Sequence, residues 1–150
     1  MHLVILTQYY PPEMGAPQAR LSELARRCVL SGHDVTVLTA MPNYPTGAIL
    51  PGYGGMYRSE VLDGVRVVRS FIHPSKSLHM VPRLANYFSF VLSSGLVGIP
   101  ALRDVDVLLT ESPPLFLGMT GFALSALKRC KWVFNVSDLW PESAEHMGVV

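Results

Sequence analysis

The sequence contains little charge. Asp, Glu, Lys and Arg together make up 15% of its 150 residues, and the formal net charge is +1. A nearly neutral chain gives no support for a nucleic-acid-binding surface, so we expect no nucleic-acid partner. Apolar residues make up 49% of the chain, which indicates about one core-rich globular domain rather than a disordered segment.

Cysteine is also scarce. The two cysteines, Cys28 and Cys130, lie far apart in apolar stretches that are helical or nearly so. We expect both to be free and buried, which suits a reducing compartment and offers no metal site. The N-terminus leads directly into an apolar run without the basic segment that opens a signal peptide. These features predict a cytoplasmic protein.

Standard cofactor and nucleophile motifs are missing. The loop after the first predicted strand carries one glycine, where a dinucleotide-binding fold needs G-x-G-x-x-G, and no acidic residue ends the second strand. The sequence also lacks Gly-Lys-Ser or Gly-Lys-Thr, a G-x-S-x-G elbow and a histidine pair at helical spacing. These absences exclude ordinary dehydrogenases, NTPases, hydrolases and metalloproteases, and we expect no metal and no cofactor.

The sequence does contain a regular alternation of strand and helix patterns. Asp63-Gly64 between two apolar runs predicts a hairpin, and Leu21, Leu24, Ala25 and Cys28 mark the inner face of the first helix. The alternation indicates an α/β fold with a doubly wound, Rossmann-like parallel sheet. Strands are predicted at residues 2–6, 34–40, 57–62, 65–71, 106–110 and 132–136, and helices from the first loop to residue 30, at 83–98 and at 115–128.

Ligands of such sheets bind beyond the carboxyl ends of the strands. Three of the four loops that we expect there combine proline with Asn, Asp, Glu or aromatic side chains. This composition is typical of a shaped pocket, and it is also ordinary turn chemistry. The four loops are residues 7–15, 41–47, 111–114 and 137–142.

The first loop leads into a helix through the segment QYYPPEMGAP, residues 8–17. The free N–H groups and the positive dipole end of a helix N-terminus attract anions. Gly15 has no Cβ that would hold a ligand away, and Pro17 suits a first helical turn. The pattern predicts a phosphate-facing loop at Gly15 and Ala16.

Three segments in order, YYPPE-x-G, GHDVTVLTA-x-PNYPTG and DLWPE, resemble the N-terminal domain of family-4 glycosyltransferases with the GT-B fold. The resemblance runs the length of the chain and is greatest to bacterial members that build surface polysaccharides on lipid-linked precursors. It implies a retaining hexosyl- or N-acetylhexosaminyltransferase with its active site between two Rossmann-like domains. The N-terminal domain would mainly hold the saccharide or lipid-linked acceptor, and the C-terminal domain the nucleotide-sugar donor.

The resemblance also implies roles for individual residues. Gly15 and Ala16 would approach the donor diphosphate. Asp138 in DLWPE would either orient an acceptor hydroxyl or cap a short helix. Glu111 falls in a loop where some relatives place a histidine near the reacting sugar, so it is either catalytic or an ordinary surface carboxylate. The residues expected to bind the acceptor are Asn43, Tyr44 and Ser112.

The chain departs from the family in its missing second half. The donor-binding domain of the family carries a Glu-x7-Glu pair, and no glutamates here have that spacing. We therefore expect residues 1–150 to be a partial N-terminal domain without the donor-binding domain. Such a fragment would be inactive alone and would self-associate through exposed apolar surface that includes parts of 119–127 and 147–150. The alternative is a non-catalytic module that binds a lipid-linked saccharide or a partner subunit.

Residues 73–103 combine an apolar helical run with Lys76, Arg83 and Arg103. Glycines, a proline and serines interrupt the run, which makes it too short and broken for a membrane span. Two interpretations stay open. The segment is either a mostly buried helix packed on the sheet, or an interfacial element that rests on the inner face of the cytoplasmic membrane.

Overall fold

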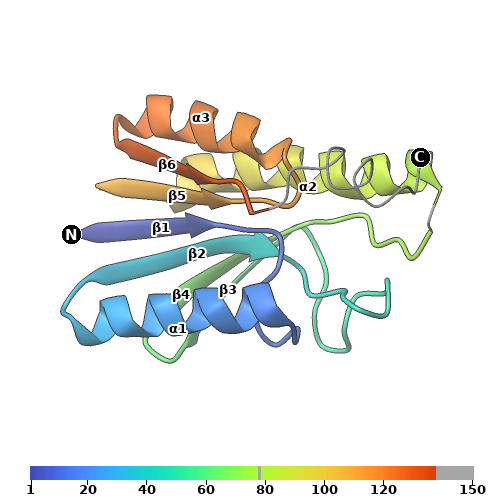
Figure 1. Ribbon diagram of the computed structural model, residues 1–150, viewed down its shortest axis with the longest axis horizontal. Coiled ribbons are helices and arrows are strands. Elements are labelled where there is room, and N and C mark those ends of the chain that lie inside the picture. The colour runs from blue at the N-terminus through green and yellow to red at the C-terminus, as the bar shows by residue number, and fades with distance from the viewer. Residues whose placement is uncertain (78, 138–150) are drawn as a thin grey trace.

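The computed structural model describes residues 1–77 and 79–137. A six-stranded sheet has helix α1 on one face and helices α2 and α3 on the other (Figure 1). The expected doubly wound α/β fold is confirmed. The strands are β1 (His2–Leu6), β2 (Asp34–Ala40), β3 (Tyr57–Leu62), β4 (Val65–Ser70), β5 (Val107–Glu111) and β6 (Lys131–Asn135), and the helices are α1 (Ala16–Leu30), α2 (Met80–Ala101) and α3 (Leu117–Lys128).

The strand order is β3-β4-β2-β1-β5-β6. All neighbours are parallel except β3 and β4, which form the predicted hairpin. Its turn residues Asp63 and Gly64 have φ angles of 52° and 79°, as a two-residue hairpin turn requires. The chain winds from β1 toward β2 and returns on the other side of β1 as β5. Because ligands bind at such a reversal point, the carboxyl ends of β1, β2 and β5 are the place to look for a site.

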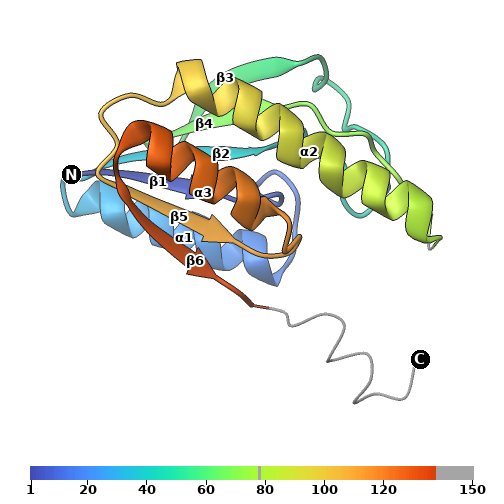
Figure 2. The ribbon, with the colours of Figure 1, turned by 90° about the horizontal axis from the view of Figure 1, so that it is seen from above.

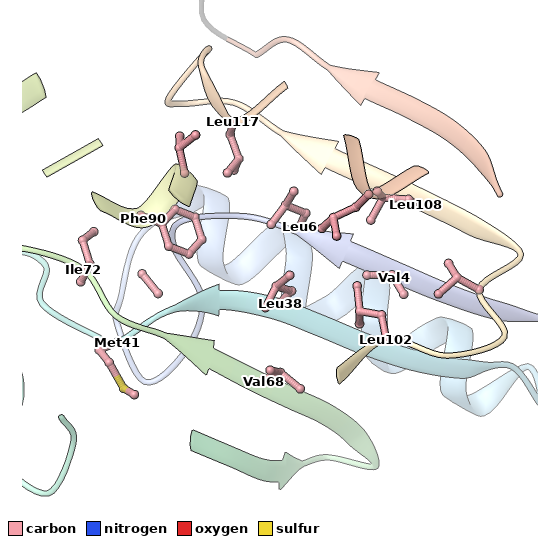
Figure 3. Close-up of a cluster of buried hydrophobic side chains, with 14 residues drawn as sticks. Val4, Leu6, Leu38, Met41, Val68, Ile72, Phe90, Leu102, Leu108 and Leu117 are labelled. Carbon is pink, nitrogen blue, oxygen red and sulfur yellow. The ribbon is translucent and has the colours of Figure 1, made fainter. Parts of the chain in front are cut away.

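Strand β1 is apolar along its length because both faces of the sheet are covered. Val4 and Leu6 point into a cluster with Phe90 of α2 (Figure 3), while Leu3 and Ile5 pack toward α1 on the other face. A strand buried on both faces is typical of parallel sheets.

Helix α1 covers its face of the sheet with a narrower stripe than expected. Leu21 and Ala25 are buried, whereas Leu24 is exposed. Cys28 and Cys130 are both free but half-buried, so the expectation of fully buried thiols is wrong. Burial still raises the pKa of the Cys130 thiol.

Helix α2 is longer and less buried than expected. It runs for 22 residues, and by length and composition it could cross a membrane. The expectation that this segment is too short and broken is therefore wrong. Only the side that carries Phe90 and Val91 packs against the sheet and α3, so a mostly buried helix is wrong as well. Figures 1 and 2 show its N-terminal part extending past the carboxyl ends of the strands.

Candidate functional site

A pocket of about 220 Å³ lies where the loops after β1, β2 and β4 meet the first turns of α2. It combines three tyrosine rings, two cationic side chains, and amide and hydroxyl groups. Aromatic faces with a few polar groups are typical of small-molecule sites. The lining residues are Tyr9, Asn43, Tyr44, Pro45, Gly47, Ser75, Lys76, Ser77, Arg83, Asn86 and Tyr87.

The buried carboxyl group of Glu13 holds two of these loops together. Its Oε1 accepts hydrogen bonds from the backbone N–H groups of Asn43 at 2.7 Å and Tyr44 at 2.8 Å. Its Oε2 accepts from the N–H of Tyr10 at 3.3 Å. Burial raises the pKa of Glu13, and the three N–H donors oppose that rise without cancelling it. The loop after β1 thereby fixes the backbone of Asn43 and Tyr44 at the pocket.

The tyrosines and Arg83 give the pocket its chemistry. Tyr9 and Tyr44 meet edge to face, with ring centroids 5.8 Å apart. Burial raises the pKa of Tyr9, so its phenol keeps its proton at neutral pH and can donate a hydrogen bond. Arg83 Nη2 donates to Tyr87 Oη at 3.3 Å, and this bond raises the pKa of Arg83. The pocket therefore contains a permanent positive charge beside hydroxyl donors.

Two consecutive amide hydrogen bonds fix the side of the pocket that Asn86 lines. Gln8 Nε2 donates to Asn86 Oδ1 at 3.1 Å, and Asn86 Nδ2 donates to the carbonyl oxygen of His73 at 2.7 Å. These bonds tie the end of β1, the start of α2 and the loop after β4 to one another. Within the described part of the chain, the buried Oε1 of Gln8 has no hydrogen-bond donor.

Gly47 allows the loop after β2 to pack on the loop after β4. Its φ angle of +66° favours glycine, and a Cβ there would lie 2.8 Å from the backbone nitrogen of Lys76. A side chain at this position would therefore push the two loops apart and reshape the pocket.

Gly15 and Ala16 lie at the exposed N-terminus of α1, as expected. Pro17 occupies the first turn. The N–H of Ala19 bonds to the carbonyl oxygen of Gly15 at 3.0 Å, so the N–H groups ahead of Ala19 have no acceptor within the helix. Gly15 is extended, with φ 167°, and a Cβ on it would lie 2.5 Å from Oε1 of the buried Gln18. Packing within the protein thus supplies a second reason for glycine at this position.

Glu111 is the last residue of β5 rather than a loop residue, and it is 2% exposed. The interpretation as a surface carboxylate is therefore wrong. The carboxylate forms an ion pair with Arg20 of α1, and it accepts hydrogen bonds from Asn135 Nδ2 at 2.8 Å and Ser137 Oγ at 2.5 Å. Glu111 joins α1, β5 and β6 at the carboxyl edge of the sheet.

Ser112 belongs to the same cluster rather than to the pocket. It is buried, its N–H donates to the carbonyl oxygen of Asn135 at 3.0 Å, and its Oγ accepts from the N–H of Ser137 at 3.1 Å. Asn43 and Tyr44 line the pocket, so the structure separates the three residues expected to bind the acceptor. Asp138 lies outside the described residues. The functional roles of all these residues stay predictions.

Sequence reasoning missed the contribution of the loop after β4. This loop supplies Ser75, Lys76 and Ser77 to the pocket. It is not among the four loops expected to hold a ligand, because the sequence predicts β4 only as the second strand of a hairpin. Yet β4 is also parallel to β2, so its carboxyl end reaches the same edge of the sheet. The predicted strand at 65–71 followed by a helix already indicates a connection at this edge, because such a strand is parallel to its neighbours in an alternating fold.

Comparison with known proteins identifies the family. Residues 15–149 match the glycosyl transferase 4-like domain, whereas no curated protein matches the chain. Within residues 1–77 and 79–137, no group of three or more His, Cys, Asp or Glu side chains could hold a metal ion. Because the match covers nearly the whole chain and the fold is a Rossmann-like half of the GT-B type, the protein belongs to the glycosyl transferase 4-like domain family.

Proposed function

We propose that the protein is the acceptor-side part of a retaining glycosyltransferase. It would transfer a hexosyl or N-acetylhexosaminyl group from a nucleotide sugar to a saccharide or lipid-linked acceptor of surface-polysaccharide synthesis, at the inner face of the cytoplasmic membrane. The pocket at the carboxyl edge of the sheet supports this proposal best. Its aromatic rings and amide and hydroxyl groups suit a sugar, and Lys76 and Arg83 suit a nearby phosphate.

The N-terminus of α1 would serve the donor. Backbone N–H groups at Gly15 and Ala16, together with the helix dipole, would stabilise the negative charge that grows on the departing nucleoside diphosphate. A second domain beyond residues 1–150 would supply most of the donor site. Asp138 would orient the acceptor hydroxyl.

A transfer assay on the full-length enzyme tests the proposal. Release of nucleoside diphosphate is measured over a panel of uridine and guanosine diphosphate sugars, with polyprenyl-diphosphate-linked N-acetylglucosamine as the acceptor. Arg83→Gln should raise the acceptor KM about tenfold to a hundredfold, since a hydrogen bond to a charged group contributes about 1.5–3 kcal/mol. Tyr44→Ala should raise it about two- to tenfold, since a neutral hydrogen bond contributes about 0.5–1.5 kcal/mol. The donor KM should stay unchanged.

Tyr57→Ala is the matched control. Tyr57 lies on β3 and is 52% exposed, close to the 48% of Tyr44, and it does not line this pocket. It should leave both KM values unchanged. Saccharide binding without transfer from any donor would support the non-catalytic module instead. If Tyr44→Ala and Arg83→Gln changed only the donor KM, the pocket would bind the donor, and its assignment to the acceptor would be wrong.

A further inference from the structure

Helices α2 and α3 present one continuous apolar surface to the outside. They lie side by side over the sheet (Figure 2), and Thr120 Oγ1 of α3 donates to the carbonyl oxygen of Val91 in α2 at 2.7 Å. We call this surface the α2/α3 face. Its exposed side chains are Phe88, Leu92, Leu96 and Ile99 of α2 and Met119, Phe122 and Leu127 of α3.

One side of helix α2 packs into the core, and the other side belongs to the α2/α3 face. Leu92 and Leu96 are 66% and 71% exposed, whereas Phe90 is fully buried. Exposed positions at 88, 92, 96 and 99 follow the helical repeat, so they form a stripe along the axis rather than scattered contacts. With α3 beside it, the stripe becomes an apolar area of the kind that marks an interaction site.

The segments that form the α2/α3 face carry only positive charges. Residues 72–103 and 112–130 contain no Asp or Glu, and their charged residues are Lys76, Arg83, Arg103, Lys128 and Arg129. Asp104 and Asp106 lie in the connection to β5, and the Asp106 carboxylate accepts a hydrogen bond from the N–H of His2 at 2.6 Å.

Helix α1 on the opposite face is built differently. Its surface carries Arg20, Glu23, Arg26 and Arg27, and the carboxylate of Glu23 pairs with both Arg26 and Arg27. Paired charges of both signs are typical of a helix that faces water. The contrast shows that the α2/α3 face is distinct from the surface on the other side of the same sheet.

We propose that the α2/α3 face docks on the surface of a lipid bilayer with anionic head groups. Its apolar centre would enter the boundary between head groups and acyl chains, and the cations at the helix ends would meet the negative charge of the lipids. Charge complementarity favours this occupant over a second copy of the chain, because two identical faces would bring like charges together. The inference rests on the proposed function, which places the enzyme at a membrane, and vesicle flotation tests it separately from the transfer assay.

Vesicle flotation with the full-length protein tests the proposal. The protein should float with vesicles of phosphatidylcholine mixed with phosphatidylglycerol, and only weakly with phosphatidylcholine alone. Leu92→Gln/Leu96→Gln should lower the partition coefficient about tenfold or more, since two long side chains leave the apolar phase. Leu24→Gln/Leu30→Gln, which changes exposed leucines of α1, is the matched control and should float like the unaltered protein.

A second pair of variants tests the electrostatic part. Arg103→Gln/Arg129→Gln should lower partitioning into the anionic vesicles about twenty-five-fold, since each cation near an anionic surface contributes about a fivefold gain. Arg26→Gln/Arg27→Gln removes the same charge from α1 and should have little effect. These exposed sites also give an answer if the leucine variants fail to fold.

Three results would overturn the proposal. The first is that the unaltered protein does not float with anionic vesicles, and the second is that it floats equally well with neutral ones. The third is that the α1 controls lose as much binding as the α2/α3 variants. A dimer that Leu92→Gln/Leu96→Gln dissociates, without vesicle binding by the unaltered protein, would instead assign the face to a contact between copies. The expected self-association through residues 119–127 would then gain support, whereas residues 147–150 lie outside the described part of the chain.

Discussion

Glu13 Oε1 accepts a hydrogen bond from the backbone N–H of Asn43 at 2.7 Å. This contact joins the loop after β1 to the loop after β2, and the same oxygen also accepts from the N–H of Tyr44. A buried carboxyl group that uses backbone donors from two loops sets the spacing between them. The shape of the pocket therefore depends on Glu13, although Glu13 does not line it.

Replacing Glu13 by alanine should damage both stability and ligand binding. The N–H groups of Tyr10, Asn43 and Tyr44 would lose their acceptor, and one unsatisfied buried polar group costs about 1–3 kcal/mol. Urea unfolding should show a loss of at least this size, and acceptor KM should rise in the fraction that stays folded. Unchanged values of both would contradict a role for Glu13 in fixing the loops.

The pH dependence of stability provides an independent test. The pKa of Glu13 is raised in the folded protein above its ordinary value of 4.5, so the folded state holds this proton to higher pH than the unfolded state. The contribution of the protonated carboxyl to stability is then complete below pH 4.5 and is lost as pH rises through the folded pKa. The unaltered protein should therefore lose its advantage in unfolding free energy over Glu13→Gln as the pH rises.

Urea titrations from pH 4 to pH 8 measure this difference, because the other carboxyl groups are common to both proteins. A difference that grows with pH would show a lowered pKa at Glu13. In that case hydrogen bonding by the three N–H groups, rather than burial, would dominate its environment.

The sheet was predictable from sequence because its determinants are local. Continuous apolar runs flanked by loops mark strands that are buried on both faces, and Asp63-Gly64 marks a hairpin turn through its backbone preference. The helix ends were less predictable. Helix α2 begins at Met80 and ends at Ala101, beyond the expected 83–98, because Pro82 fits a first turn and Pro100 still lies within the last one.

The candidate site was less predictable because contacts distant in sequence build it. Asn43 and Tyr44 line the pocket, as the position of their loop predicts. Ser112 has the same kind of position, but it bonds instead to the end of β6 and the residues after it. Burial of Glu111 depends on Arg20 in α1 and Asn135 in β6. No local pattern specifies that set of partners.

Gly15 has two possible reasons to be glycine, and a pair of variants separates them. A Cβ would crowd the side chain of Gln18, so Gly15→Val alone confuses internal packing with exclusion of a ligand. Gln18→Ala removes the crowding side chain. In that background the valine side chain would hold the donor phosphate away from the backbone N–H groups. Gly15→Val should then lower kcat about a hundredfold, as loss of contact with one charge-stabilising donor does, while the melting temperature stays close to that of Gln18→Ala.

Steady-state kinetics of Gln18→Ala and of Gly15→Val/Gln18→Ala make the comparison directly. Equal turnover in the two proteins would leave Gly15 with a packing role only. The donor-phosphate assignment of Gly15 and Ala16 would then have no support from this position.

Glu111 offers the last test, because the structure and the family resemblance point to different roles. Its carboxylate already bonds to Arg20, Asn135 and Ser137, which leaves little capacity for a substrate. Glu111→Gln keeps the shape but loses the charge, and it turns one acceptor into a donor. We expect the free energy of unfolding to fall by about 1–3 kcal/mol, with kcat per folded molecule nearly unchanged.

Arg20→Ala is the companion variant, since it removes the cation of the same pair from a half-exposed position. If Glu111 has a structural role, the two substitutions should be less than additive in a double-mutant cycle measured by urea unfolding. A fall in kcat of a hundredfold or more for Glu111→Gln, with stability retained, would make Glu111 a catalytic residue. The cluster would then act in the reaction rather than in holding α1, β5 and β6 together.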